Sequence, residues 1–134
     1  MMRVGVLGAA CASTEKYIGH LRAIPGVELV GIADPDVERG TKTASPSGLT
    51  FFPEPDALLS QALEGAIICA EVGQRCALVE RAAEQARHIL CEIPMGQTTE
   101  DARAAIETCQ TRSAVLQPAF VLRFAPVFKL MKQW

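Results

Sequence analysis

Three residues of the sequence are suited to binding a charged nucleotide, and each comes at the end of a short apolar run. They are Gly8, Asp34 and Glu92. A glycine in such a turn lets backbone N–H groups approach a phosphate, and a carboxylate accepts hydrogen bonds from ribose hydroxyls. The spacing therefore predicts a phosphate- and ribose-binding site that is assembled from separate turns of the chain.

The elements that position these residues alternate between strand and helix. Residues 3–36 are predicted to form a strand, a tight turn, a helix, a second strand and an acid. The helix carries one apolar stripe, made of Tyr17, Ile18, Leu21 and Ile24. This order is the first unit of a dinucleotide-binding βαβ fold, in which the helix N-terminus faces the pyrophosphate and the acid meets the ribose.

The rest of the chain continues the alternation. Further strands are predicted at residues 49–52, 66–70, 88–92 and 114–120. Further helices are predicted at residues 55–63, 74–87 and from 100 onward, the last capped by Thr98 or Thr99, and a short helix from Pro35 is expected to end at Gly40. The pattern indicates an α/β fold with a doubly wound, mostly parallel sheet in three αβα layers. Its ligand crevice would lie at the strand ends, which are Gly8, Asp34, Phe52, Ala70, Glu92 and Phe120.

Composition narrows the class of protein. A chain of 134 residues fits one domain, and a hydrophobic content of 49% can supply a sizeable core. A net charge of -2 argues against a nucleic-acid partner, and no apolar run has the length of a membrane span. The N-terminus begins with a strand and shows no signal-peptide pattern. We expect an α/β domain over residues 1–120 and a helical tail over residues 121–134.

The cysteines and histidines suggest neither disulfides nor a metal site. The five cysteines are Cys11, Cys69, Cys76, Cys91 and Cys109. Their odd number and spacing match no zinc or CxxC pattern, so we expect reduced thiols and a cytoplasmic protein. The two histidines have no partner at metal-ligand spacing, which predicts no bound metal.

Four segments of the chain resemble the nucleotide-binding half of the glucose–fructose oxidoreductase / inositol dehydrogenase / MocA family. They are residues 4–10, 33–36, 89–94 and 123–126, and their order and spacing also match. The resemblance implies a Rossmann domain that binds NAD(P) in an oxidoreductase acting on sugars, polyols or related alcohols. The cofactor-binding positions would be Gly8, Ala10, Cys11, Asp34, Ala70 and Glu92.

Several positions depart from the family pattern. The loop over residues 8–13 keeps only the first glycine of a Gly-x-Gly-x-x-Gly-like motif, with Ala10 in place of the second. Ile93 stands where relatives carry the lysine of Glu-Lys-Pro, which is implied to assist proton transfer, and isoleucine donates no proton. Glu71 stands where Pro-Asn is usual, and its charge is expected to disfavour a diphosphate. The second domain of the family, with its substrate pocket, is expected to be absent.

The sequence leaves alternatives open for Gly8 and Asp34, the residues expected to lie near the adenosine of a bound cofactor. Gly8 forms either a phosphate-facing turn or an ordinary strand-to-helix turn. Asp34 binds the ribose, caps the helix from Pro35, or does both. An acid at this position repels a 2′-phosphate and favours NAD over NADP, although the nearby Arg39 could accommodate that phosphate.

Other residues also allow alternatives. Glu92 faces the nicotinamide or is a solvated carboxylate at the rim of the crevice. Arg75 is interpreted as a surface charge at a helix start, with a substrate ligand as the alternative. Cys11 is a small loop filler or a redox thiol whose pKa is lowered by a helix N-terminus. An apolar stripe in the tail packs on the core or forms an association site for a homo-oligomer; it comprises Phe124, Val127, Phe128 and Met131.

Three functions are consistent with this sequence. The first is the NAD-binding part of an oxidoreductase whose catalytic lysine and substrate domain are missing here. The second is a non-catalytic nucleotide-binding or sensing module. The third is an interaction scaffold that has kept the fold and lost the ligand.

Overall fold

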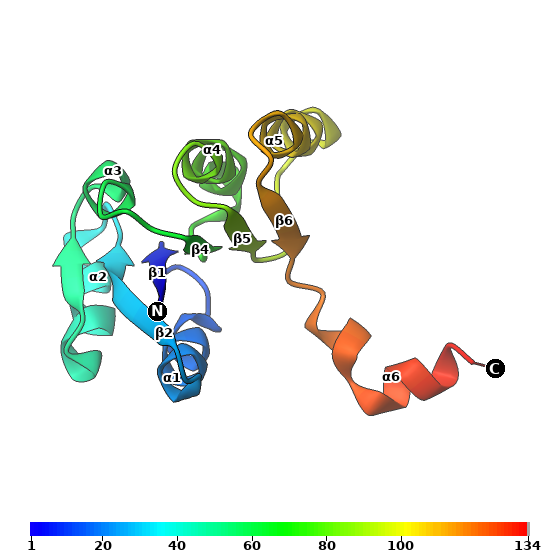
Figure 1. Ribbon diagram of the computed structural model, residues 1–134, viewed down its shortest axis with the longest axis horizontal. Helices are drawn as coiled ribbons and strands as arrows, with labels where there is room; N and C mark the ends of the chain where they lie inside the picture. The colour runs from blue at the N-terminus through cyan, green and yellow to red at the C-terminus, as the bar shows by residue number, and fades with distance from the viewer. Residues whose placement is uncertain (134) are drawn as a thin grey trace.

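The protein is built on one six-stranded sheet in which every neighbouring pair of strands is parallel, as the computed structural model of residues 1–133 describes it (Figure 1). The strands are β1 (Met2–Leu7), β2 (Val27–Ala33), β3 (Thr50–Phe52), β4 (Gly65–Ile68), β5 (His88–Cys91) and β6 (Val115–Pro118). Their order across the sheet is β3-β2-β1-β4-β5-β6. The predicted doubly wound parallel sheet is therefore confirmed.

Helices cover both faces of the sheet and complete the three layers. They are α1 (Thr14–Ala23), α2 (Val37–Ala44), α3 (Pro55–Leu59), α4 (Val72–Ala83) and α5 (Thr99–Thr111). A sixth helix, α6 (Pro126–Met131), lies in the C-terminal tail, and short 3₁₀ turns form η1 (Ser45–Ser47) and η2 (Val121–Phe124). Figure 1 shows α3, α4 and α5 on one face and α1 and α2 on the other. Thr98 caps α5 by accepting a hydrogen bond from the backbone N–H of Asp101, as its sequence predicts.

The strand order reverses at β1, which pairs with β2 on one side and β4 on the other. Leu7 is in register with both Ala33 and Ile68, so residues 8, 34 and 69 follow at the same edge of the sheet. A parallel sheet leaves a crevice outside the carboxyl ends of the strands where the order reverses. The fold thus brings together turns that lie far apart in the sequence.

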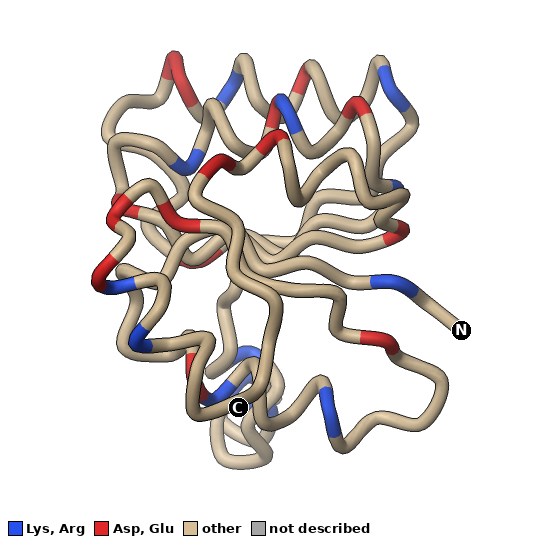
Figure 2. Tube along the Cα trace, turned by 90° about the vertical axis from the view of Figure 1, so that its left-hand side faces the viewer, with Lys and Arg blue, Asp and Glu red and all other residues tan. Residues whose placement is uncertain are grey.

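Alternate residues of the central strand supply two apolar clusters, one for each face. Leu7 packs with Ile68 and Val79 in the cluster under α3, α4 and α5. Val6 packs with Ile18 in the cluster on the opposite face. Charged residues lie mainly on the helices and loops, and the strands are almost free of them (Figure 2). This alternation explains why nearly continuous apolar runs form the strands of a sheet that is covered on both faces.

The helix α2 differs from its prediction in both its cap and its length. Asp36, not Asp34, caps it, with the Asp36 carboxylate 3.0 Å from the backbone nitrogen of Arg39. Gly40 does not end the helix, which continues to Ala44. A Cβ atom at Gly40 would lie 2.3 Å from the ring of Phe51, so glycine is needed there for close packing of α2 on β3. The glycine was thus a packing signal and not a stop signal.

The C-terminal tail projects away from the sheet (Figure 1). Phe124, Val127, Phe128 and Met131 are all exposed to solvent. The alternative in which this stripe packs on the core of the domain is therefore wrong. No helix within the described residues is both long and apolar enough to cross a membrane.

Candidate cofactor site

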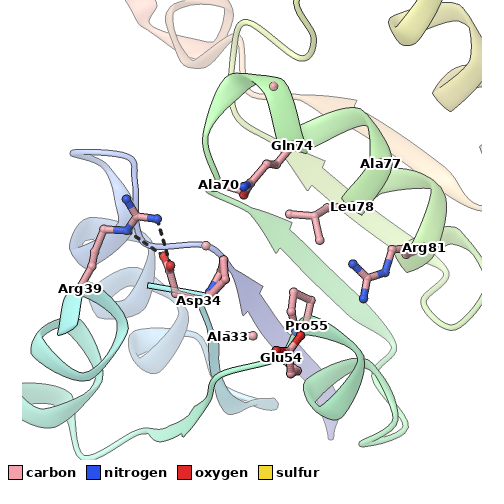
Figure 3. A pocket seen from close by; sticks show the side chains of 13 residues that line it. Ala33, Asp34, Arg39, Glu54, Pro55, Ala70, Gln74, Ala77, Leu78 and Arg81 are labelled. Carbon is pink, nitrogen blue, oxygen red and sulfur yellow. Dashed lines mark hydrogen bonds and ion pairs between the residues drawn. The ribbon is translucent and has the colours of Figure 1, made fainter. Parts of the chain in front are cut away.

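A cleft of about 340 Å³ opens at the point where the strand order reverses. Gly8, Asp34 and Ala70 line it together with Arg39, Gln74 and Leu78. Figure 3 shows the Arg39 side chain directed at Asp34, with Leu78 and Arg81 of α4 across the cleft and Glu54 and Pro55 on a third side. Three of the six predicted cofactor positions therefore lie around one cavity.

Gly8 allows the first turn to pass close to the end of β4. Its φ is +93°, and a Cβ atom there would lie 2.3 Å from the Cα of Ala70. Its N–H donates to the carbonyl oxygen of Ala33 at 2.7 Å. Any side chain at Gly8 would collide with backbone as well as straining φ, so this glycine fixes the approach of β1 and β4 at the crevice.

Asp34 is completely buried, and its carboxylate accepts four hydrogen bonds. Oδ2 accepts from the backbone N–H of Ala9 at 2.7 Å and from Nε of Arg39 at 3.0 Å. Oδ1 accepts from the backbone N–H of Asp36 at 2.8 Å and from Nη2 of Arg39 at 3.0 Å. With two donors on each oxygen, the carboxylate is saturated, and a ribose diol would reach it only if Arg39 moved away.

Arg39 also bridges the cleft to Glu71, with Nη1 2.8 Å from Oε1. The hydrogen bonds to Asp34, and after them the bond to Glu71, raise the pKa of Arg39 above its usual range, so the guanidinium stays charged. The charge of Glu71 is therefore compensated by Arg39 and is not directed, unpaired, at the position of a diphosphate. Sequence alone gave no sign of this pairing, because the two residues are 32 positions apart.

The loop after Gly8 presents unpaired backbone donors. None of the N–H groups of residues 11–13 has a hydrogen-bond acceptor within residues 1–133, and Ser13 makes no side-chain cap to α1. Free N–H groups at the start of a helix, with the positive end of its dipole behind them, form a binding surface for a diphosphate. The loop presents these free donors although residues 8–13 contain only one glycine.

Ala10 and Cys11 lie against the end of β4. The N–H of Ala10 donates to the carbonyl oxygen of Cys69 at 3.0 Å. The thiol of Cys11 lies 3.0 Å from Nη2 of Arg75. The neighbouring thiol of Cys69 lowers the pKa of Cys11 to about 7, against the effect of burial and with the help of the charge of Arg75. The lowered pKa was expected, but its main causes are these two neighbours, which come from another part of the chain.

Arg75 is buried, with 6% of its surface exposed, so its interpretation as a surface charge is wrong. Its Nε donates to the carbonyl oxygen of Ala70 and its Nη1 to that of Pro94, both at 2.8 Å. The guanidinium thereby ties the end of β4 to the loop after β5. Its position in the first turn of α4 suggested an exposed side chain. The loops on either side bury it, and this can be seen only in the folded structure.

Glu92 lies beyond Cys11, at the end of β5. Its Oε1 accepts a hydrogen bond from the hydroxyl of Tyr17 at 2.9 Å, and its Oε2 accepts one from the N–H of Ile93 at 3.1 Å. Burial, and then this hydrogen bond, raise the pKa of Tyr17 above its usual range. The carboxylate is therefore fixed by α1 and is not a freely solvated charge at the rim.

Together, the predicted residues form a line along the carboxyl edge of the sheet, from Asp34 past Gly8 and Ala70 to Cys11 and Glu92. Sequence reasoning missed Gln74 and Leu78 as parts of the cleft. The topology could have indicated them, because the first turns of α4 follow directly from the end of β4. Within the described residues, no group of three or more potential ligands is arranged to hold a metal ion.

Solved structures share this architecture closely. UDP-N-acetylglucosamine 3-dehydrogenase GnnA from Acidithiobacillus ferrooxidans matches with a TM-score of 0.86 and 29% identity, over 98% of this chain and 42% of that one. The WlbA dehydrogenase from Bordetella pertussis, in complex with NADH and UDP-GlcNAcA, matches with a TM-score of 0.89 and 22% identity, over 98% of this chain and 41% of that one. The second likeness shows a common fold alone.

Curated sequences include relatives with named activities. The chain is 29% identical to D-xylose 1-dehydrogenase (NADP(+)) 2 from Haloferax volcanii, over 94% of this chain and 39% of that protein. It is 27% identical to inositol 2-dehydrogenase 4 from Saccharopolyspora erythraea, over 98% of this chain and 40% of that protein. The chain thus spans about two-fifths of the length of the curated relatives that it matches. The sequence model of the GFO/IDH/MocA family, described as an oxidoreductase family with an NAD-binding Rossmann fold, matches residues 2–120, and the chain belongs to this family.

Proposed function

We propose that this chain is the NAD(H)-binding domain of an oxidoreductase that acts on a sugar, a polyol or a similar alcohol. The free N–H groups of residues 11–13, next to the cleft at the strand reversal, carry the proposal. The adenosine would occupy the cleft beside Asp34, the diphosphate would lie on this loop, and the nicotinamide would extend toward Glu92. The names of the relatives support the substrate class, since they are dehydrogenases of a pentose, an inositol and a nucleotide sugar.

Different residues of the site would bind different parts of the cofactor. When bound, a nicotinamide dinucleotide supplies the hydride acceptor or donor. Residues 11–13 would hold its diphosphate, Asp34 its adenosine ribose, and Tyr17 would fix the orientation of Glu92. Ile93 neither donates nor accepts a proton, so the acid or base of the reaction has to come from outside this set of residues.

NADH is the cofactor that we propose, with NADPH bound more weakly. The buried carboxylate of Asp34 would repel a 2′-phosphate, while its oxygens can accept hydrogen bonds from a 2′-hydroxyl once Arg39 moves away from them. The opposing contribution is Arg39, which lies over the carboxylate and could pair with a phosphate. The relatives differ in this respect, since one is named for NADP and another is crystallised with NADH.

Titration calorimetry with NADH and then NADPH tests this proposal. We expect NADH to bind more tightly, and Asp34→Asn to weaken NADH by about tenfold or more while affecting NADPH less. Glu28→Gln, at the opposite end of β2, is the matched control and should change neither affinity. Binding of neither cofactor, or equal losses for both, would contradict the assignment of Asp34.

A non-catalytic nucleotide-binding module is the second candidate, and Ile93 favours it. If the lysine implied by the family resemblance is all that is lost, Ile93→Lys should raise any trace of dehydrogenase activity toward xylose or myo-inositol. The assay is NADH formation, followed by absorbance. A variant that binds NAD and still shows no gain would support the module, while absence of binding would support a scaffold.

The boundary between the Rossmann unit of residues 1–120 and the tail of residues 121–134 is part of the same proposal. The exposed stripe on η2 and α6 supports a role of the tail as an association site between copies of the chain. Deletion of residues 124–134 should then lower the mass found by sedimentation equilibrium, and an unchanged mass would remove this role. The five free cysteines support the expected cytoplasmic location.

A further inference from the structure

Two cysteines from different parts of the chain lie next to each other at the loop that follows β1. Cys11 belongs to that loop, and Cys69 directly follows β4. The two backbones are held together there, because the N–H of Cys69 donates to the carbonyl oxygen of Leu7 at 2.7 Å and the N–H of Ala10 donates to that of Cys69 at 3.0 Å. The thiol of Cys11 lies 3.9 Å from the carbonyl oxygen of Ala70, the residue after Cys69, and Cys11 packs against the apolar cluster to which Cys69 belongs. None of the steps of the proposed function uses either thiol.

The pair is asymmetric in access and in charge. Cys69 is completely buried, while Cys11 is partly exposed, so a reagent in solution meets only Cys11. Arg75 lies 3.0 Å from the sulfur of Cys11 and is held in place by two backbone carbonyl groups, which fixes a positive charge beside this thiol. The buried hydroxyl of Thr14, at the start of the helix that follows this loop, has no hydrogen-bond partner within residues 1–133.

We propose that Cys11 and Cys69 form an oxidisable pair, in which hydrogen peroxide reacts at Cys11 and Cys69 then closes a disulfide. The Cys11 thiolate attacks one peroxide oxygen, the O–O bond breaks, and hydroxide leaves and takes up a proton to form water. The sulfur of Cys69 next attacks the sulfenic sulfur of Cys11, the S–O bond breaks, and water leaves with the proton of the Cys69 thiol. Two thiols lose two electrons in all, and the peroxide gains them.

The other three cysteines lack this arrangement. Cys76, Cys91 and Cys109 are buried, and burial raises the pKa of each of their thiols. Arg75 donates to the sulfur of Cys11 alone among the described cysteines. The chain therefore contains its own controls, since a reaction that depended only on the presence of a thiol would not distinguish these residues from Cys11.

Peptide mapping gives a direct test of the pair. Trypsin places Cys11 in the peptide of residues 4–16 and Cys69 in that of residues 43–75, where each is the only cysteine. Treatment of the folded chain with stoichiometric peroxide should link these two peptides, with loss of two hydrogen atoms in mass. Linkage at Cys76, Cys91 or Cys109 to the same extent, or no intramolecular linkage, would overturn the proposal.

Variants separate the two chemical steps. In Cys69→Ser the sulfenic acid of Cys11 should accumulate and be trapped by dimedone, whereas Cys11→Ser should show neither trapping nor linkage. Arg75→Gln should slow the peroxide reaction at pH 7 by about three- to tenfold. Cys109→Ser is the matched control and should behave as the unaltered chain. Trapping at equal rates in Cys69→Ser and in the unaltered chain would show that Cys69 does not resolve the sulfenic acid.

A consequence for the cofactor rests on the proposed function. The linked loop presents residues 11–13, so we expect the oxidised chain to bind NADH at least about tenfold more weakly, with recovery after reduction by dithiothreitol. Calorimetry on both forms distinguishes the two proposals. A linked chain whose reduced form binds no NADH would refute the proposed function alone, and a reduced chain that binds NADH but never forms the link would refute the thiol pair alone.

Discussion

Two arginines lie at the two ends of the same crevice, and their surroundings differ. Arg39, at the end where we propose that the adenosine binds, is 29% exposed and binds the carboxylates of Asp34 and Glu71. Arg75, at the loop end, is buried and binds two backbone carbonyl groups and a thiol. Arg39 forms ion pairs at a partly open site, whereas Arg75 connects two loops through hydrogen bonds to their backbone carbonyl groups.

This difference indicates what each arginine can do. An ion pair at a partly open site exchanges partners at small cost, so a ligand carrying hydroxyls or phosphate can compete for Arg39. A buried guanidinium whose partners are backbone carbonyls has no substitute partner, and its removal leaves those carbonyls unsatisfied. We therefore assign Arg39 to ligand selection and Arg75 to the shape of the site.

The largest effect is expected at Gly8, which lies between the two ends and holds them at their present distance. Gly8→Ala should lower the free energy of unfolding by about 3–4 kcal/mol, because it adds a collision with the backbone of Ala70 to an unfavourable φ. Gly26→Ala is the matched control: its φ is also positive, at +83°, but nothing lies within 4 Å of the added Cβ. Its cost should be only about 1 kcal/mol in urea denaturation. Equal costs would mean that the close approach to Ala70 is not what requires glycine.

Arg75→Met sharpens the assignment of the loop end. We expect a loss of about 3 kcal/mol of unfolding free energy, since the carbonyl groups of Ala70 and Pro94 would lose their donor while buried. The exposed Arg103 on α5 provides the control, and Arg103→Met should change stability by less than about 0.5 kcal/mol. The measurement is denaturation followed by circular dichroism. If Arg75→Met lowered the unfolding free energy as little as Arg103→Met, the two hydrogen bonds of Arg75 would not stabilise the loops.

Arg39→Gln tests the adenosine end. We expect a loss of about 1–2 kcal/mol, because Asp34 keeps two backbone donors and Arg39 is partly exposed. Unlike Arg75→Met, this variant should free the carboxylate for a ribose and raise the affinity for NADH relative to NADPH, as measured by calorimetry. A fall in the affinity for NADH would show instead that Arg39 itself contacts the dinucleotide.

The smallest perturbation is a change of pH. Because the pKa of Cys11 is lowered to about 7, its thiolate forms at a lower pH than that of an unperturbed cysteine, and it is lost again as the pH falls below 7. The rate of alkylation of Cys11 by iodoacetamide should therefore be half-maximal near pH 7. Arg75→Met should move the midpoint upward, whereas Arg39→Gln should leave it in place. If Arg39→Gln also shifted the pH midpoint of alkylation, the charge of Arg39 would act on Cys11. The two ends of the crevice would then not be electrostatically independent.

Local sequence predicted the elements that depend on local forces. The apolar runs at β1, β2 and β4 and the stripes on their connecting helices were sufficient for the strand and helix order, since both patterns follow from burial of one face or two. Thr98 acts within its own turn and was identified as a possible cap of α5 from its side chain alone. The role of Gly40 could not be predicted in this way, because it depends on the ring of Phe51, a residue of the next strand.

By itself, the sequence determined the alternation of strands and helices, the family, and the turns at which Gly8, Asp34 and Glu92 would meet. The alternation and the placing of these turns at one edge follow from residue types and from the near-universal hand of parallel crossovers, and the family follows from the resemblance of four segments. Only the tertiary structure decided which charges are compensated and which are buried. The carboxylate of Asp34 is saturated by Arg39 and two backbone N–H groups, and Glu71 is paired with Arg39. Arg75 is buried, and Cys11 lies next to Cys69. Each of these outcomes depends on groups that are distant in the sequence, and the electrostatics of a side chain is set by the neighbours that folding brings to it.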